Sequence, residues 1–230
     1  MYQPFGGGQP SSWSEGVEKL KSRLNMEFAM GVATIAALAT AIGAAPIAPA
    51  MAEVRTSDTV ATENALDALG LLAAPSLGRS VDLSAPTGAL DSNRGLVVGS
   101  GDGEVTVRPL TDGPATLSPS GKSLVYSSST SHSIALTGKT TAADAGYVVI
   151  NDASAPEDYA FNLATDGIPA VLELVEDRVL VKDAAGDVVN VISPAWAVDS
   201  SGRSISTTYS VAGSVLTQHV DHAGAEYPVA

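Results

Sequence analysis

The residues that say most about the architecture of this chain are 179–191, VLVKDAAGDVVNV. β-branched and apolar side chains flank a short polar segment, which is the pattern of two strands joined by a tight turn. Gly186 stands where a type I turn with a G1 bulge requires a left-handed residue. The stretch therefore predicts a hairpin that pairs residues 179–182 with residues 188–191.

Similar runs recur from residue 96 to near the end of the chain, at intervals of roughly ten residues. They read LVVGS, EVTVRP, SLVYSS, HSIAL, GYVVIN, DYAFNL, AVLELV, RVLVK, DVVNVIS, SISTTYSV and SVLTQHV. Further tight turns are expected at residues 175–178 and at Ala212-Gly213. Many short strands separated by turns are typical of antiparallel sheets. The predicted fold class is mainly β, an antiparallel sandwich or a barrel-like fold.

The first part of the chain has the pattern of a secretory signal. Residues 28–45, FAMGVATIAALATAIGAA, contain no charged side chain. Three basic residues precede this segment and a small-residue triplet follows it: Lys19, Lys21 and Arg23, then Ala50-Met51-Ala52. This order is typical of a signal peptide, so we expect export and cleavage after Ala52. A retained membrane anchor is the main alternative, because the apolar segment is about long enough to span a bilayer, and a buried helix is the other.

A short amphipathic helix is expected after the signal segment. In residues 59–75, TVATENALDALGLLAAP, apolar side chains recur at helical spacing. They are Ala61, Ala65, Ala68, Leu69 and Leu72. Asp58 or Thr59 is available as the N-cap, and Pro75 as the stop. The Gly, Ser and Pro content of residues 76–95 then predicts a linker.

The chain is expected to divide into four parts. Residues 1–52 are the signal peptide or membrane anchor, and residues 53–95 the short helix and linker. Residues 96–140 form a weakly patterned β segment, and residues 141–230 a well patterned β domain. The boundary near residue 140 depends on the polar and small residues of TGKTTAADAG.

Composition excludes several classes of function. The chain has 230 residues, 45% of them hydrophobic, and a net charge of -13. Nucleic acid is not expected as a partner, because a phosphate backbone requires clustered Lys and Arg side chains. The sequence has no cysteine, which excludes thiolate zinc sites and cysteine nucleophiles. Packing alone, without disulfides, is expected to hold the fold.

His219, Asp221 and His222 lie close together near the C-terminus. Alternation along a strand places His219 and Asp221 on one face and His222 on the other. A zinc site would need further ligands, such as His132 or distant carboxylates. A half-exposed hairpin with polar side chains is therefore expected, with no metal ligand and no catalytic histidine.

Three glycine-containing motifs resemble phosphate-binding or nucleotide-binding sequences. The tripeptides at residues 121–123 (GKS) and 138–140 (GKT) lack the first glycine of a P-loop, since Thr116 and Ser133 occupy its position. The run GSGDGE at residues 99–104 lacks the third glycine of a dinucleotide fingerprint. We interpret all three as turns or loops, and predict no catalytic, cofactor-binding or metal-ligating residue and no cofactor.

Acidic and aromatic side chains offer the remaining candidates. Asp158, Glu173, Glu176 and Asp177 include enough carboxylates for a glycosidase pair, but their default place is a solvated turn or strand face. The aromatic residues of the patterned half are expected in the core: Tyr159, Phe161, Trp196 and Tyr209. An exposed aromatic strip that binds glycans is the alternative.

Residues 181–229 carry several local motifs: a hairpin, a Pro-Ala-Trp-Ala-Val-Asp corner, a Ser-Gly-Arg turn, and a Val-Asp-His before Tyr-Pro-Val. With these motifs, the segment from Tyr159 to Val229 resembles an uncharacterised β-rich C-terminal domain of exported proteins from high-GC Gram-positive bacteria, the actinobacteria. The resemblance implies no activity and no catalytic residue. Similar proteins commonly continue beyond the Tyr-Pro-Val.

Together these features predict an exported, non-enzymatic β-rich protein that acts as a binding or structural module at the cell envelope or in the medium. Its partner would be a cell-wall component or a protein, and membrane contact would come only through an uncleaved N-terminal segment. A cell-envelope hydrolase and an accessory module of a secreted toxin are the alternatives. An enzyme should place a histidine and a carboxylate within hydrogen-bond reach in a concave pocket. A binding module should instead expose an apolar or aromatic patch.

Overall fold

A computed structural model of the chain describes residues 50–68, 71–72, 88–99, 101, 103–127, 129–139, 141 and 143–229. The predicted apolar segment at residues 28–45 lies outside the described residues, as does most of the predicted linker. None of the helices within the described ranges combines the length and apolar character needed to span a bilayer.

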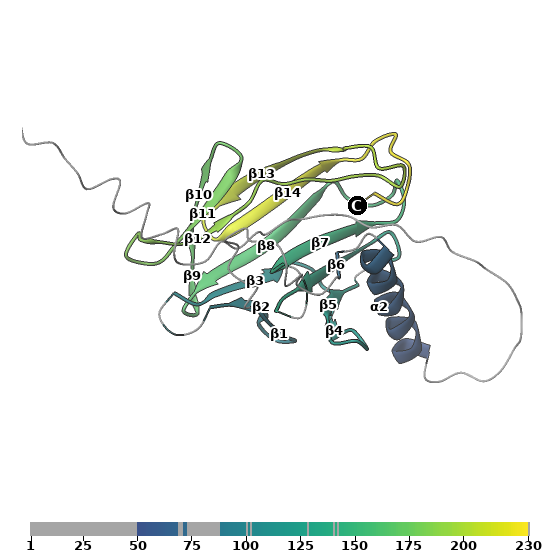
Figure 1. Ribbon diagram of the computed structural model, residues 1–230, viewed down its shortest axis with the longest axis horizontal. Coiled ribbons are helices and arrows are strands. Elements are labelled where there is room, and N and C mark those ends of the chain that lie inside the picture. The colour runs from purple at the N-terminus through teal and green to yellow at the C-terminus, as the bar shows by residue number, and fades with distance from the viewer. Residues whose placement is uncertain are drawn as a thin grey trace, which may run out of the picture.

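A seven-stranded antiparallel sheet, as counted over the described residues, runs the length of the molecule (Figure 1). Its order is β1-β2-β3-β8-β14-β13, with β9 paired to β8. The strands are β1 (Ala89–Asp91), β2 (Gly95–Val98), β3 (Val105–Pro109), β8 (Asp158–Thr165), β9 (Ile168–Pro169), β13 (Ser206–Ala212) and β14 (Val215–Asp221). Burial alternates along β8 and β14, so one face carries core residues such as Phe161 and Leu216.

A four-stranded antiparallel sheet lies beside strands β1 and β2 of the larger sheet. It consists of β4 (Ala115–Leu117), β5 (Ser123–Tyr126), β6 (His132–Thr137) and β7 (Ala145–Ile150), paired in chain order. Every residue of β5 and β7 is buried. Strands that are covered on both faces have continuous apolar runs. Here α2 (Ala50–Ala68) contacts β5, and in the larger sheet β1 contacts β5 and β2 contacts β6.

The predicted amphipathic helix exists, but it begins at Ala50, so the predicted N-cap at Asp58 or Thr59 is wrong. Residues 50–56, AMAEVRT, contain no helix breaker, and the helix therefore extends through them. Thr62 faces β6, where its Oγ1 lies 2.9 Å from Oγ of Ser133. Of the predicted apolar face, Ala65 and Leu72 are buried and Ala61 is half-buried, while the side chains of Ala68 and Leu69 lie outside the described residues. Leu66, which the prediction did not place on that face, is fully buried.

The third sheet is an antiparallel meander of β10 (Val171–Val175), β11 (Arg178–Lys182) and β12 (Val188–Ile192). The predicted hairpin between β11 and β12 is confirmed. Gly186 has a φ of 91°, and the register shifts at Val181 and Lys182 as expected for a bulge. The predicted tight turns after Val175 and at Ala212-Gly213 are confirmed as well.

The fold class is confirmed as mainly β with antiparallel sheets, but the sheets of the described residues do not close into a barrel. Each of the eleven predicted runs contains a strand, whereas β1, β4 and β9 were not predicted. β1 lies inside the predicted linker at residues 76–95, so the interpretation of those last residues as linker is wrong. The division near residue 140 stays a prediction; strands from both sides of it pair, β6 with β7 and β3 with β8.

The C-terminal residues close the fold at the end opposite the three-stranded sheet (Figure 1). Val229 forms isolated bridges with Ile150 and with Asp199. Asp199 accepts hydrogen bonds from the backbone and hydroxyl of Ser201 and from Nε of Arg203. Three separate sequence motifs are thus in contact at this end of the fold. They are the Pro-Ala-Trp-Ala-Val-Asp corner, the Ser-Gly-Arg turn and the Tyr-Pro-Val segment.

Candidate functional site

The tight turn between β10 and β11 forms one lip of a pocket. Val175 pairs with Arg178, so Glu176 and Asp177 alone make the turn. Glu176 has a φ of 58°, a left-handed conformation that is uncommon for residues other than glycine. Both acidic side chains are exposed, and neither forms a hydrogen bond or ion pair with a described residue. The turn therefore presents two unpaired carboxylates.

Tyr209 supplies the floor of the pocket. It lies on β13, the edge strand of the seven-stranded sheet, directly opposite Gln218 of β14. The residue is 8% exposed, and its hydroxyl is buried without a hydrogen-bond partner among the described residues. Burial raises the pKa of the Tyr209 hydroxyl above its ordinary value, so the group stays neutral at physiological pH. A neutral hydroxyl offers one donor and two acceptor sites.

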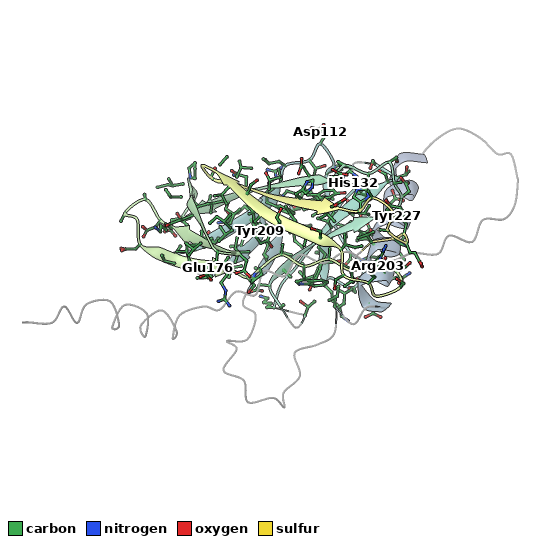
Figure 2. The ribbon with its side chains drawn as sticks, turned by 90° about the horizontal axis from the view of Figure 1, so that it is seen from above. Asp112, His132, Glu176, Arg203, Tyr209 and Tyr227 are labelled. Atoms are coloured by element: carbon green, nitrogen blue, oxygen red, sulfur yellow. The ribbon has the colours of Figure 1, made fainter. Side chains whose placement is uncertain are left out.

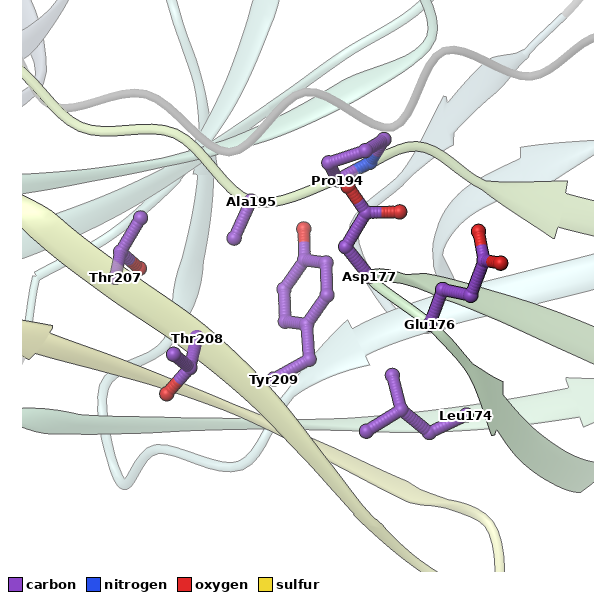
Figure 3. Close-up of a pocket in the computed structure, with 8 residues that line it drawn as sticks. All are labelled: Leu174, Glu176, Asp177, Pro194, Ala195, Thr207, Thr208 and Tyr209. Carbon is purple, nitrogen blue, oxygen red and sulfur yellow. The ribbon is translucent and has the colours of Figure 1, made fainter.

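The segment that follows β12 supplies the facing wall. Pro194 and Ala195 pass over β13 there, and Leu174 of β10 completes the apolar lining. Figure 3 shows the ring of Tyr209 rising from β13 between Ala195 and Asp177, with its hydroxyl toward the segment that carries Pro194. The pocket has a volume of about 360 Å³ and is also lined by Thr207 and Thr208.

Exposed apolar side chains lie on β9 and β10. They are Ile168, Val171, Leu174 and Val175, each between 39% and 53% exposed. Alternation places Leu174 on the pocket side of β10 and Val171 and Val175 on the other. Of these four side chains, Leu174 is the one that lines the pocket.

His219 and Asp158 form a histidine–carboxylate pair outside the pocket. Nδ1 of His219 lies 2.9 Å from Oδ1 of Asp158, across the β8–β14 register. The two side chains are 45% and 70% exposed. Asp221 is exposed at the end of β14 and does not join them. The described residues contain no group of three or more side chains suited to a metal ion.

His222 directly follows β14, and its burial agrees with the face that alternation along the strand predicts. It is 3% exposed, and its Nδ1 lies 2.8 Å from the hydroxyl of Tyr227. The same hydroxyl donates to the carbonyl of His222 at 2.9 Å, and Nε2 lies 3.3 Å from the carbonyl of Pro156. These contacts join His222 to Tyr227 within the C-terminal segment and to Pro156 in the connection before β8, so His222 has a structural role.

His132 lies at the same end of the molecule as Tyr227 and Arg203, away from Glu176 (Figure 2). Its Nδ1 lies 3.0 Å from Oγ of Ser129, and its ring packs edge-on against Tyr159. Burial lowers the pKa of His132, because desolvation disfavours the imidazolium. No described carboxylate contacts this imidazole, so the serine–histidine contact lacks the third group of a catalytic triad.

The glycine-containing motifs lie in connections between strands. Gly121, with a φ of 72°, turns the chain from β4 into β5, and Gly138 follows β6. The glycines of residues 99–104 connect β2 to β3, where the carboxylate of Asp166 accepts hydrogen bonds from the amides of Gly103 and Glu104. None of these connections leads into a helix among the described residues, which a nucleotide-binding glycine loop requires.

The structure separates the candidate carboxylates and aromatic residues. Glu176 and Asp177 meet at the pocket, whereas Glu173 pairs with Lys182 and Asp158 with His219.

The core prediction is correct for three aromatic residues and only in part for the fourth: Tyr159, Phe161 and Tyr209 are buried, and Trp196 is half-buried.

Sequence reasoning missed the pocket because its residues come from three separate segments. The sequence carried no signal for it, because the positive φ of Glu176, in a two-residue turn without Gly or Asn, is known only from the structure.

We compared the chain with models of protein families, with curated proteins and with solved structures. None of them matches it. The resemblance to an actinobacterial exported domain therefore stays a prediction.

Proposed function

We propose that the protein is a non-enzymatic binding module that holds a small ligand, or a side chain of a larger one, in the Tyr209 pocket. The pocket is defined here by its lining residues: Leu174, Glu176, Asp177, Pro194, Ala195, Thr207, Thr208 and Tyr209. One observation carries the proposal, namely that Tyr209, whose buried hydroxyl has no hydrogen-bond partner among the described residues, lines this pocket.

An unpartnered buried hydroxyl is unfavourable for folding. Leaving such a group unsatisfied costs about 1 to 3 kcal/mol, and buried polar groups are therefore nearly always paired. A ligand that hydrogen-bonds to Tyr209 would remove this cost. The volume of about 360 Å³ falls in the range of known ligand pockets.

A cell-envelope hydrolase is the second candidate, because His219 and Asp158 lie within hydrogen-bond distance. General acid–base catalysis requires a substrate held against such a pair. Both side chains are largely exposed, and neither lines the Tyr209 pocket. This arrangement gives the hydrolase less support than the binding module.

The proposed place of action is the cell envelope or the medium. It depends on the sequence pattern at residues 1–52 and on the resemblance of the C-terminal segment to exported proteins. The net charge of -13 is compatible with a cationic partner in either place.

A nuclear magnetic resonance titration tests the proposal. The ¹⁵N-labelled protein is titrated with a five-compound panel: n-butylamine, n-butanol, butyrate, methyl glucoside and phenol. We expect at least one compound to shift the amides of Leu174, Ala195, Thr208 and Tyr209 in a saturable way. Tyr209→Phe should weaken that binding, whereas Ser210→Ala, an exposed neighbour on β13, should not. Absence of any saturable shift at these residues would contradict the proposal.

A further inference from the structure

We infer that the Tyr209 pocket selects an alkylammonium group, that is, a primary amine at the end of a short alkyl chain. This inference rests on the proposed function, because it names the ligand class of the same pocket. It combines three observations: the charge of the lip, the polar groups of the floor and the apolar wall.

All formal charge on the pocket lining is negative. Glu176 and Asp177 are the charged residues among those that line it. Arg178 follows them in sequence, but it pairs with Val175 and so lies on the face of the hairpin opposite Leu174. The two carboxylates therefore have no cationic partner of their own among the described residues, and an incoming ammonium would provide one.

The floor adds neutral hydroxyl groups. The Tyr209 hydroxyl is un-ionised at neutral pH, because the ordinary pKa of tyrosine is about 10 and burial raises the pKa further. It has no partner among the described residues. Thr208 and Thr207 also line the pocket. The Thr207 hydroxyl already donates to the carbonyl of His219 and accepts from Nε2 of Gln218, so it has one acceptor site left. An ammonium group donates three hydrogen bonds and accepts none, so it matches a set of carboxylate and hydroxyl oxygens better than an anion does.

The apolar wall matches an alkyl chain. Leu174, Pro194 and Ala195 lie beside the tyrosine ring in the same pocket (Figure 3). A polyol would bury hydroxyl groups against these side chains without partners, which is unfavourable. A chain of methylene groups instead buries apolar surface there, as lysine side chains do when their charged end remains near water.

The amine has two possible sources that share this chemistry, a free alkylamine and a lysine side chain in an extended peptide. β13 is the last strand of the seven-stranded sheet among the described residues, with β10 packed beside it, so a peptide could add only along the part of its edge that β10 leaves open. The experiment therefore includes n-butylamine and the peptide Ac-Thr-Val-Lys-Val-Thr-NH₂, with n-butanol and the norleucine peptide as their uncharged counterparts.

We expect n-butylamine to shift the amides of Leu174, Ala195, Thr208 and Tyr209 with an affinity about tenfold or more above that of n-butanol, because hydrogen bonds to charged groups are the stronger ones. Butyrate should not bind. The preference should decrease at high salt, since the lip carboxylates are exposed. If the lysine peptide binds and also shifts the amides of Ser206 and Ser210, the ligand is a lysine side chain in a peptide. If n-butylamine binds and the peptide does not, the ligand is a free amine. Both results support an alkylammonium ligand.

A matched pair of double variants separates the local effect from net charge. Glu176→Gln with Asp177→Asn should reduce the affinity for n-butylamine about tenfold, to the level of n-butanol. Glu157→Gln with Asp187→Asn changes net charge equally, but at residues outside the pocket, and should leave the affinity unchanged.

Two results would overturn the inference in distinguishable ways. Equal or tighter binding of n-butanol or methyl glucoside at the same amides would reject the alkylammonium ligand and leave the binding module in place. Absence of any saturable shift at these amides, with all panel compounds and both peptides, would reject the inference together with the proposed function.

Discussion

Asp199 and Arg203 form an ion pair that closes the C-terminal end of the fold. Nε of Arg203 donates to Oδ2 of Asp199 at 3.0 Å, and Nη2 of Arg203 donates to the carbonyl of Gly224 at 3.0 Å. The Asp199 side chain is fully buried, whereas that of Arg203 is 56% exposed. The pair thus connects the turn before β13 to the segment after β14.

Asp199→Asn should lower the melting temperature by several degrees. The carboxylate accepts hydrogen bonds from Ser201 and from the backbone and side chain of Arg203, and an amide cannot accept all of them. Loss of a buried network is a recognised cause of destabilisation. Thermal unfolding followed by circular dichroism measures the change. Asp187→Asn, in an exposed turn, is the control, and an equal melting temperature for both variants would contradict the role of Asp199.

The contribution of Asp199 should also depend on pH. The hydroxyl of Ser201, followed by the amide and side chain of Arg203, holds the pKa of this carboxyl well below its ordinary value. A lowered pKa in the folded state stabilises the protein above the ordinary carboxyl pKa of about 4. This stabilisation is lost as the pH falls below that value. The difference in melting temperature between wild type and Asp199→Asn should be constant from pH 5 to 7 and should narrow below about pH 4.

Leu216→Ala should destabilise the protein by about 2 to 5 kcal/mol, the usual cost of truncating a buried leucine. Leu216 is fully buried on β14, where it pairs with Val211 and Phe161 on the neighbouring strands. Val171→Ala, at a residue that is 52% exposed, should change stability by less than about 0.5 kcal/mol. Urea denaturation measures both values. Similar costs at the two positions would contradict the burial assigned to β14 and β10.

Tyr209→Phe should leave the free energy of unfolding unchanged or raise it by up to about 1 kcal/mol. The substitution removes a hydroxyl that is buried without a partner and keeps the ring in place. Urea denaturation in the absence of ligand gives the value. Tyr126→Phe is the matched variant, because it also removes a buried hydroxyl that has no partner among the described residues. A loss of more than 1 kcal/mol for Tyr209→Phe alone would show that this hydroxyl has a partner in the folded chain.

Most of the strand content was predictable because it follows from local pattern. β-branched runs and turn residues identified β10, β11 and β12, and Gly186 identified the bulged turn. β1 and β4 escaped prediction because they are short and lie among polar residues. Their pairing is determined by the neighbouring strands β2 and β5, and tertiary contacts commonly override weak local preference in this way.

The candidate site was not predictable from the sequence. Glu176 and Asp177 appeared as two acids among 25 acidic residues, and Tyr209 as a core aromatic residue. Only the packing of β10 against β13 brings them to one pocket. The pairing of His219 with Asp158 depends likewise on the β8–β14 register, which joins distant parts of the chain.

Blocking the pocket with a covalent label tests the central claim most directly. The chain has no cysteine, so Ala195→Cys carries a single thiol in the pocket wall and Ser210→Cys a single exposed thiol outside it. Both variants are labelled with N-ethylmaleimide and titrated with the five-compound panel. We expect the labelled Ala195→Cys protein to lose every saturable shift at Leu174 and Tyr209, while the labelled Ser210→Cys protein keeps them. Unchanged binding by the labelled Ala195→Cys protein would contradict the account.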